Sequence, residues 1–147
     1  MVSSRICPPS LAKMNSTLMN KFVIDSWAWV EYLRGSSRGG RVRELLEEKK
    51  NELFTHAVSV AEVVSKLRRA NLDYGEAWRA IASNSKIVIP SGADAFETGL
   101  LHASMKRERR NFSLADTFVL LSARQNRARV LTGDPDFSGL TDAVIVA

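Results

Sequence analysis

Residues 113–137, SLADTFVLLSARQNRARVLTGDPDF, read as a helix, a short turn, a buried strand and an acidic loop. Asp116 lies in the first turn of this helix, and Asp134 follows the strand at 128–132. In an alternating α/β chain, strand ends and the starts of the following helices share one edge of the sheet, where such folds place their chemistry. We therefore expect Asp116 and Asp134 to meet at that edge.

The rest of the chain continues the alternation of strands and helices. Short apolar runs predict further strands at 21–24, 52–56 and 86–89, with an edge strand at 143–146. Apolar residues at helical spacing predict helices between them, at 26–34, 41–50, 59–70, 73–84 and 93–109. This order predicts a three-layer α/β/α fold with a central, mainly parallel sheet of four to five strands.

Two of these helices carry more specific expectations. Ser59-x-x-Glu62 has the spacing of a capping box, so the helix at 59–70 is predicted to begin there. In the helix at 93–109, the predicted apolar positions are Phe96, Leu100 and Leu101.

Composition limits the class of protein and the kind of metal site. The 147 residues suit one domain, and no apolar run is long enough for a membrane span. A single cysteine excludes a disulfide framework and fits a reducing cytoplasm. With only two histidines, any metal would be held by oxygen. The net charge of +5 suits either simple solubility or a polyanionic partner such as nucleic acid.

The first twenty residues differ from the rest of the chain. They contain Cys7 and lack the apolar core of a secretory signal. We interpret residues 1–20 as a disordered tail or an overlong start, with Met19 as an alternative beginning, and assign the globular domain to residues 21–147.

Two earlier acids are predicted to join Asp116 and Asp134. Asp25 ends the first strand, and Glu62 lies in the helix after the second. Taken singly, each of the four suits an ordinary helix cap. Taken together, helix starts at one edge of a sheet would bring four carboxylates close enough to repel, and a divalent cation relieves that repulsion. The oxygen ligands favour Mg²⁺ or Mn²⁺ over Ca²⁺.

Neighbouring residues have both functional and structural interpretations. The hydroxyls of Ser26 and Thr132 would suit the hydration shell of the metal, or only a helix cap and a strand end. Asp136 is either a fifth acid or part of a tight turn. Of Trp27 and Trp29, one is expected in the core and the other at a base or a partner interface. A basic run upstream of Asn111 is predicted to bind RNA phosphates or to form a solvated helix end: Lys106, Arg107, Arg109 and Arg110.

Four stretches resemble a known family: FVIDSWAWVEYLRGS, HAVSVAEVVSKLRR, FSLADTFVLLSAR and VLTGDPDF. In this order and spacing they are similar to the PIN-domain nucleases, and in size the chain looks like the VapC-type toxins of toxin–antitoxin pairs. The resemblance implies a PIN-like fold, Mg²⁺- or Mn²⁺-dependent cleavage of RNA, a homodimer and a cognate antitoxin. It also implies that Asp25, Glu62, Asp116 and Asp134 are the acidic metal-binding quartet. The chain departs from the pattern at Trp27, where many members have a small polar residue.

Three functions compete for this pattern. The first is a metal-dependent ribonuclease acting as a toxin, and the second is a non-catalytic RNA- or protein-binding module that keeps the acids as caps. The third is another doubly wound phosphate enzyme, such as a phosphatase or a receiver domain. The third is disfavoured because Trp27 occupies the second position of an Asp-x-Asp motif and no glycine-rich phosphate loop is present.

Overall fold

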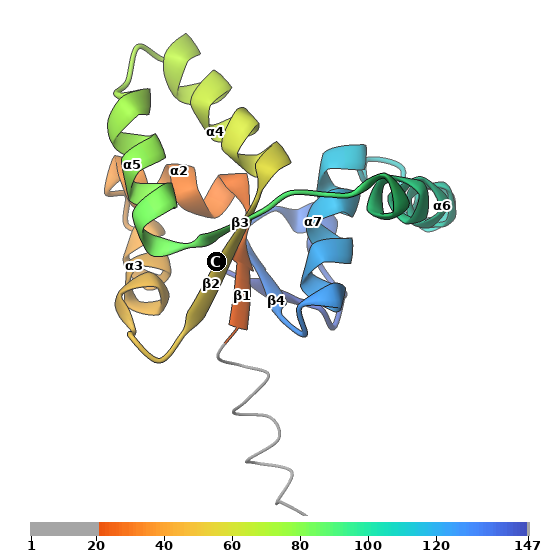
Figure 1. Cartoon of the computed structure of the whole chain (residues 1–147). Helices are drawn as coiled ribbons and strands as arrows, with labels where there is room; N and C mark the ends of the chain where they lie inside the picture. Colours follow the sequence, from red (N-terminus) through yellow and green to blue (C-terminus); the bar gives the residue numbers. More distant parts are fainter. Residues whose placement is uncertain (1–20, 147) are drawn as a thin grey trace, which may run out of the picture.

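The computed structural model describes residues 21–146, so Cys7 and the predicted tail at 1–20 lie outside the described part. Its centre is one sheet of five parallel strands in the order β3-β2-β1-β4-β5 (Figure 1). The predicted α/β architecture is confirmed, including the position of the last strand at an edge. The strands are β1 (Lys21–Ile24), β2 (Glu52–His56), β3 (Lys86–Val88), β4 (Arg129–Thr132) and β5 (Ala143–Ile145).

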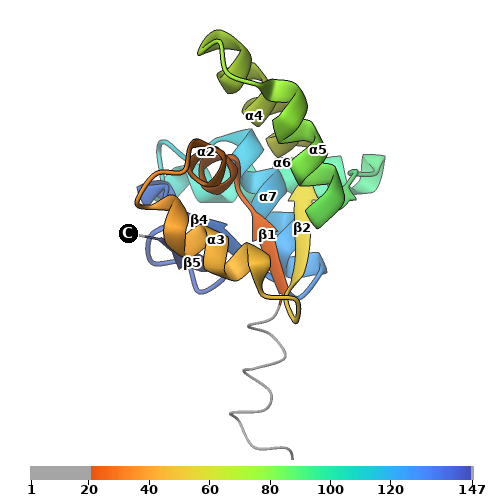
Figure 2. The ribbon, with the colours of Figure 1, turned by 90° about the vertical axis from the view of Figure 1, so that its left-hand side faces the viewer.

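Helices cover both faces of this sheet (Figures 1 and 2). One face carries α2, α3 and α5, and the other carries α7 with α6 outside it, while α4 extends beyond the edge where the strands end. The helices are α2 (Ser26–Arg34), α3 (Gly39–Glu47), α4 (Ala57–Arg69), α5 (Tyr74–Asn84), α6 (Gly92–Glu108) and α7 (Leu114–Gln125), and a 3₁₀ turn, η1, spans Pro135–Phe137.

Side chains along each strand point alternately to the two faces of the sheet, and this alternation divides the core into two layers. Ile24 and Leu131 pack with the residues of α2 to α5, whereas Val23 and Val130 pack with α7. All four side chains are fully buried, because successive residues of a strand point to opposite faces and both faces are covered. Each buried side chain of this size contributes about 1.5–3 kcal/mol.

Trp29 is the tryptophan that belongs to the core, as predicted for one of the pair. It is fully buried, and its Nε1 donates a hydrogen bond to Thr55 Oγ1 over 3.1 Å. The Thr55 hydroxyl is also 2.7 Å from Ser85 Oγ. These bonds connect α2 to β2 and to the end of α5, which holds α2 against the sheet directly after Asp25.

The predicted start of α4 is wrong. The helix begins at Ala57, and His56 is its N-cap, with Nδ1 accepting a hydrogen bond from the Val58 N–H over 3.0 Å. Ser59 therefore lies inside the first turn, where its hydroxyl is buried and has no hydrogen-bond partner among the described residues. As a result, Glu62 lies in the second turn and does not cap the helix.

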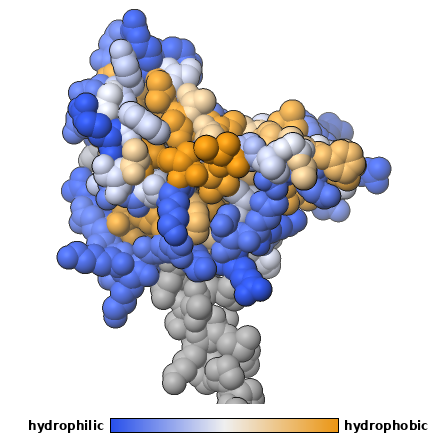
Figure 3. Space-filling model, viewed as in Figure 1, coloured by the Kyte–Doolittle hydropathy of each residue, from blue (hydrophilic) through white to orange (hydrophobic). Residues whose placement is uncertain are grey.

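The apolar face predicted for α6 is only partly correct. Leu101 packs against the core, but Phe96 is 67% exposed and Leu100 is 56% exposed. Figure 3 shows apolar surface in the middle of the molecular face in view, and this surface continues onto α6. Within the described residues, no helix combines the length and the apolar character that a membrane span requires.

Replacing Ser59 tests the observed start of α4. Because the buried hydroxyl has no partner, we expect Ser59→Ala to raise the free energy of unfolding by roughly 1 kcal/mol, measured by urea denaturation. Ser113→Ala is the matched control, because Ser113 does form a capping box, and it should lose about 1 kcal/mol. If Ser59→Ala lowered the free energy of unfolding as much as Ser113→Ala does, the result would instead support a capping box at Ser59.

Candidate functional site

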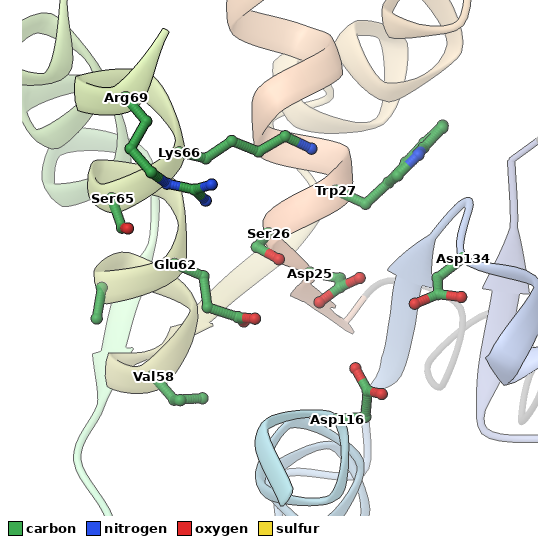
Figure 4. Close-up of a pocket in the computed structure, with 11 residues that line it drawn as sticks. Asp25, Ser26, Trp27, Val58, Glu62, Ser65, Lys66, Arg69, Asp116 and Asp134 are labelled. Atoms are coloured by element: carbon green, nitrogen blue, oxygen red, sulfur yellow. The ribbon is translucent and has the colours of Figure 1, made fainter. Parts of the chain in front are cut away.

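The four predicted acids lie around one cavity of about 530 Å³ at the carboxyl edge of the sheet (Figure 4). Asp25 follows β1, Asp134 follows β4, Asp116 lies in the first turn of α7, and Glu62 extends from α4. Because β2, β1 and β4 are parallel neighbours, the chain leaves all three strands at the same edge. The structure thus brings together side chains that are up to 109 positions apart in the sequence, counting from Asp25 to Asp134.

Thr132 holds two of these acids in place. Its hydroxyl donates to Asp25 Oδ2 over 2.7 Å and accepts from the Asp134 N–H over 3.0 Å. Asp25 is 4% exposed and Thr132 is fully buried. The hydroxyl, which the sequence allowed to serve either a hydrated metal or only a strand end, is therefore engaged by protein groups on both sides.

Asp116 is both a helix cap and a member of the acidic cluster. The Ser113 hydroxyl accepts a hydrogen bond from the Asp116 N–H, and Asp116 Oδ2 accepts one from the Ser113 N–H, each over 3.0 Å. The two predicted interpretations of Asp116 are thus compatible. The capping box fixes the carboxylate through one oxygen and turns it toward the cavity (Figure 4).

Asp136 joins Asp116 and Asp134, as the interpretation of a fifth acid predicts. One carboxylate oxygen from each of these three residues lies within 4.8 Å of the others. Asp134 also caps η1, because its Oδ1 accepts a hydrogen bond from the Asp136 N–H over 2.9 Å. A set of oxygen ligands at this spacing fits a hard divalent cation such as Mg²⁺ or Mn²⁺.

The electrostatics of the site centre on Asp116. The pKa of Asp25 is raised from its ordinary value of 3.8 to about 7, mainly by burial and in part by the Asp116 carboxylate, against the lowering effect of the Thr132 hydrogen bond. Burial and the same carboxylate also raise the pKa of Glu62. Burial raises the pKa of Asp116 itself, to which Asp134 and Asp136 add their repulsion. A bound cation would favour the charged form of all these acids.

Two basic residues of this cavity were not predicted as site residues. Lys66 and Arg69 line it together with Glu62, from which they are separated by four and seven positions on α4. This spacing places three residues on one face of a helix and is the sequence signal that indicates them. Glu62 and Lys66 form no ion pair within 4.0 Å in residues 21–146, although Lys66 lowers the pKa of Glu62.

Ser26 and Trp27 also line the cavity, from the first turn of α2. The Ser26 hydroxyl acts on the pKa of Glu62 in the lowering direction, against burial and Asp116. Ser26 therefore lies close to Glu62. This position is compatible with both predicted interpretations of Ser26, in the hydration shell of a metal or as a helix cap.

The basic run at the end of α6 lies elsewhere, because none of its four residues lines the cavity. Arg109 Nη1 donates to the backbone oxygens of Asp136 and Ser138, over 2.9 and 2.7 Å. Lys106 Nζ donates to the Arg110 carbonyl. Arg109 thus holds the acidic loop in position, and RNA binding by Lys106, Arg107, Arg109 and Arg110 stays a prediction.

Gly133 allows the acidic loop to pass under Trp27. A Cβ at this position would lie 2.3 Å from Trp27 Cη2, which is closer than atoms can approach. We expect Gly133→Ala to displace the ring or the loop and to lower the free energy of unfolding by about 1–3 kcal/mol, measured by urea denaturation. Gly99→Ala, where a Cβ meets open space on α6, should stabilise the protein slightly and serves as the control. Equal effects of the two substitutions would contradict the close packing at Gly133.

The raised pKa of Asp25 predicts a pH dependence of stability. A carboxyl whose pKa is higher in the folded protein contributes stability that is complete below its ordinary pKa of 3.8 and is lost as the pH rises through about 7. Over this window, without metal, the unfolding free energy should fall in the wild type relative to Asp25→Asn, by up to about 4 kcal/mol. His56, whose pKa burial lowers, acts in the opposite direction in both proteins and cancels in the difference. Urea unfolding in EDTA across this range is the measurement, and parallel curves would contradict the assignment.

The fold is shared with solved structures of toxins. A toxin–antitoxin complex from Klebsiella pneumoniae superposes with a TM-score of 0.65 at 18% identity, covering 85% of this chain and 97% of the other. The toxin VapC20 of Mycobacterium tuberculosis, described as cleaving the sarcin–ricin loop, gives 0.65 at 16% identity, with 82% and 95% covered. VapBC2 of Rickettsia felis, bound to a promoter DNA fragment, gives 0.63 at 14% identity, with 85% and 96% covered.

The sequence itself provides a second and independent comparison. A search of curated protein sequences gives no significant match. The family model described as the PIN domain matches residues 22–142, which contain β2, β3 and β4, all of β1 except its first residue, and all the acids of the cavity. The chain therefore belongs to the PIN domain family.

Proposed function

We propose that this PIN domain is a metal-dependent endoribonuclease, which hydrolyses RNA phosphodiester bonds and acts as the toxin of a type II toxin–antitoxin system. The observation that carries the proposal is the convergence of Asp25, Glu62, Asp116 and Asp134 on one cavity, with Asp136 beside them. Such a group of carboxylates is costly in the absence of a cation, as the raised pKa values of Asp25, Glu62 and Asp116 indicate.

The proposed cofactor is Mg²⁺ or Mn²⁺, which would be held by Asp116, Asp134 and Asp136 together with Asp25. When bound, it would supply the positive charge that activates a water and stabilises the leaving oxygen. The protein itself keeps the carboxylates that would bind the metal in position. Thr132 orients Asp25, and Arg109 holds the loop of Asp134 and Asp136. Glu62, whose pKa is raised, is suited to accept the proton of the attacking water.

Two protein partners belong to this proposal. The structure from K. pneumoniae is a toxin–antitoxin complex, which supports an antitoxin partner for this chain in the cytoplasm. Exposed apolar side chains on and beside α6, at Ile89, Phe96 and Leu100, support a homodimer with a second copy of the chain. Light scattering of the purified protein measures this state directly, and a monomeric mass would exclude the homodimer.

Cleavage of a mixed RNA pool with Mn²⁺ or Mg²⁺, repeated in EDTA, tests the nuclease. We expect Asp116→Asn and Glu62→Gln to lower the rate by at least about 100-fold, because they remove a ligand charge and a proton acceptor. Glu44→Gln is the matched control: Glu44 is exposed on α3, and its loss should leave the rate unchanged. Wild-type rates in Asp116→Asn would remove this residue from the mechanism.

The same experiment separates the nuclease from a non-catalytic binding module. A module that keeps the acids only as caps should neither cleave RNA nor bind Mn²⁺ in calorimetry. Cleavage that persists in EDTA and in Asp116→Asn would come from a contaminant. Metal-dependent cleavage that is lost in the variants is the expected result.

A further inference from the structure

We propose that Lys66 and Arg69 bind the phosphate next to the cleaved one, so that an unpaired RNA strand crosses the cavity between α4 and Trp27. The inference rests on the proposed function, which it makes more specific: it assigns the path of the strand across the cavity and its single-stranded state. It also assigns the phosphate contacts to α4, and not to the basic run at the end of α6, for which the sequence pattern allowed either RNA binding or a solvated helix end.

The first argument is position along one helix. Glu62, Lys66 and Arg69 lie on the same face of α4 and line the same cavity. With a rise of about 1.5 Å per residue, Lys66 is roughly 6 Å and Arg69 roughly 10 Å farther along the helix axis than Glu62. A phosphate held by these two side chains is therefore a neighbour of the phosphate at the acids.

The second argument is that both cations are available. Within residues 21–146, neither Lys66 nor Arg69 has a carboxylate within 4.0 Å, and neither side chain donates a hydrogen bond to another described residue. In contrast, Lys86 pairs with Glu52 and Arg124 with Asp142. Figure 4 shows both side chains projecting from α4 over the cavity. An arginine fork and a lysine ammonium next to each other suit a phosphate dianion or diester.

The third argument is the opposite wall of the cavity. Trp27 stands at the start of α2, beside Asp134 (Figure 4), and the benzene ring of its indole packs against Gly133. It is partly exposed and lines the cavity, unlike Trp29, which is fully buried. A fixed aromatic ring at the edge of a nucleic-acid site is suited to stack on a base, and only an unpaired base offers its face.

The charges of the cavity explain why such a clamp is needed. Five acids surround the position of the cleaved phosphate, and they repel the rest of the strand wherever the metal does not neutralise them. Lys66 and Arg69 are the basic residues that line this cavity in the described part of the chain. They offset the repulsion on the side where the strand leaves the acids.

Binding of a fluorescein-labelled single-stranded RNA, followed by anisotropy, tests the clamp. The full chain is used in EDTA and in an Asp116→Asn background, because both conditions are expected to suppress cleavage. We expect Lys66→Gln/Arg69→Gln to weaken binding at least tenfold. The magnitude of the slope of log K against log salt should fall by about 0.7, because the two side chains hold one phosphate and each neutralised single-strand phosphate contributes about 0.7.

Two further pairs of substitutions remove the same charge elsewhere. Lys49→Gln/Lys50→Gln changes exposed residues before β2, at the opposite edge of the sheet, and should weaken binding less than twofold. Lys106→Gln/Arg107→Gln tests the alternative path along α6. A larger loss in that pair than in Lys66→Gln/Arg69→Gln, or equal losses in all three pairs, would overturn the proposal.

The single-stranded state has its own comparison. The same RNA annealed to its complement should bind at least tenfold more weakly, and Trp27→Ala should remove this preference while Trp27→Phe keeps it. Equal affinity for the duplex and the single strand would overturn the stacking role. If the wild type cleaves RNA but the three double substitutions weaken binding equally, only this inference is refuted. If the wild type binds Mn²⁺ and cleaves no RNA, the proposed function is refuted.

Discussion

The hydroxyl of Thr132 is the contact on which the acidic site depends. It is fully buried, donates to the Asp25 carboxylate and accepts from the Asp134 N–H, and so it connects the ends of β1 and β4. These strands are hydrogen-bonded neighbours, with Ile24 paired to Leu131, and the residues that follow each strand must therefore be neighbours as well. Without the parallel pairing, the bridge between Asp25 and Asp134 could not form.

Around this bridge, the protein gathers like charges at one edge of the sheet, with Asp25 buried and the other acids partly exposed or exposed. Burial and mutual repulsion raise the pKa values of Asp25, Glu62 and Asp116, so the metal-free site is electrostatically strained. Several contacts hold these acids and the loop that carries Asp134 in position. The Ser113 capping box orients Asp116, Arg109 bonds the backbone of the acidic loop, and Gly133 lets Trp27 pack over that loop.

Local patterns predicted much of this site, and their failures have local causes. The acids were identified because strand ends and helix starts share one edge of a parallel sheet, which requires only the order of elements. Ser59 was misassigned as the N-cap of α4 because His56, three positions earlier, supplies a side-chain acceptor for the first turn of the helix. A sequence pattern does not show which of the two residues the helix uses as its cap. Arg109 was grouped with its basic neighbours because a run of cations does not reveal which member reaches a backbone 27 positions away.

The sequence by itself determined the class of fold, the oxygen-rich character of the candidate site and which four acids line its cavity. These follow from the period of apolar residues, the scarcity of histidine and cysteine, and the position of each acid beside a strand or helix start. The tertiary structure alone decided that Asp136 joins Asp116 and Asp134, that Lys66 and Arg69 face the same cavity, and that Thr132 is engaged. Those outcomes depend on distances between side chains from separate elements, and such distances are set only when the helices pack against the sheet.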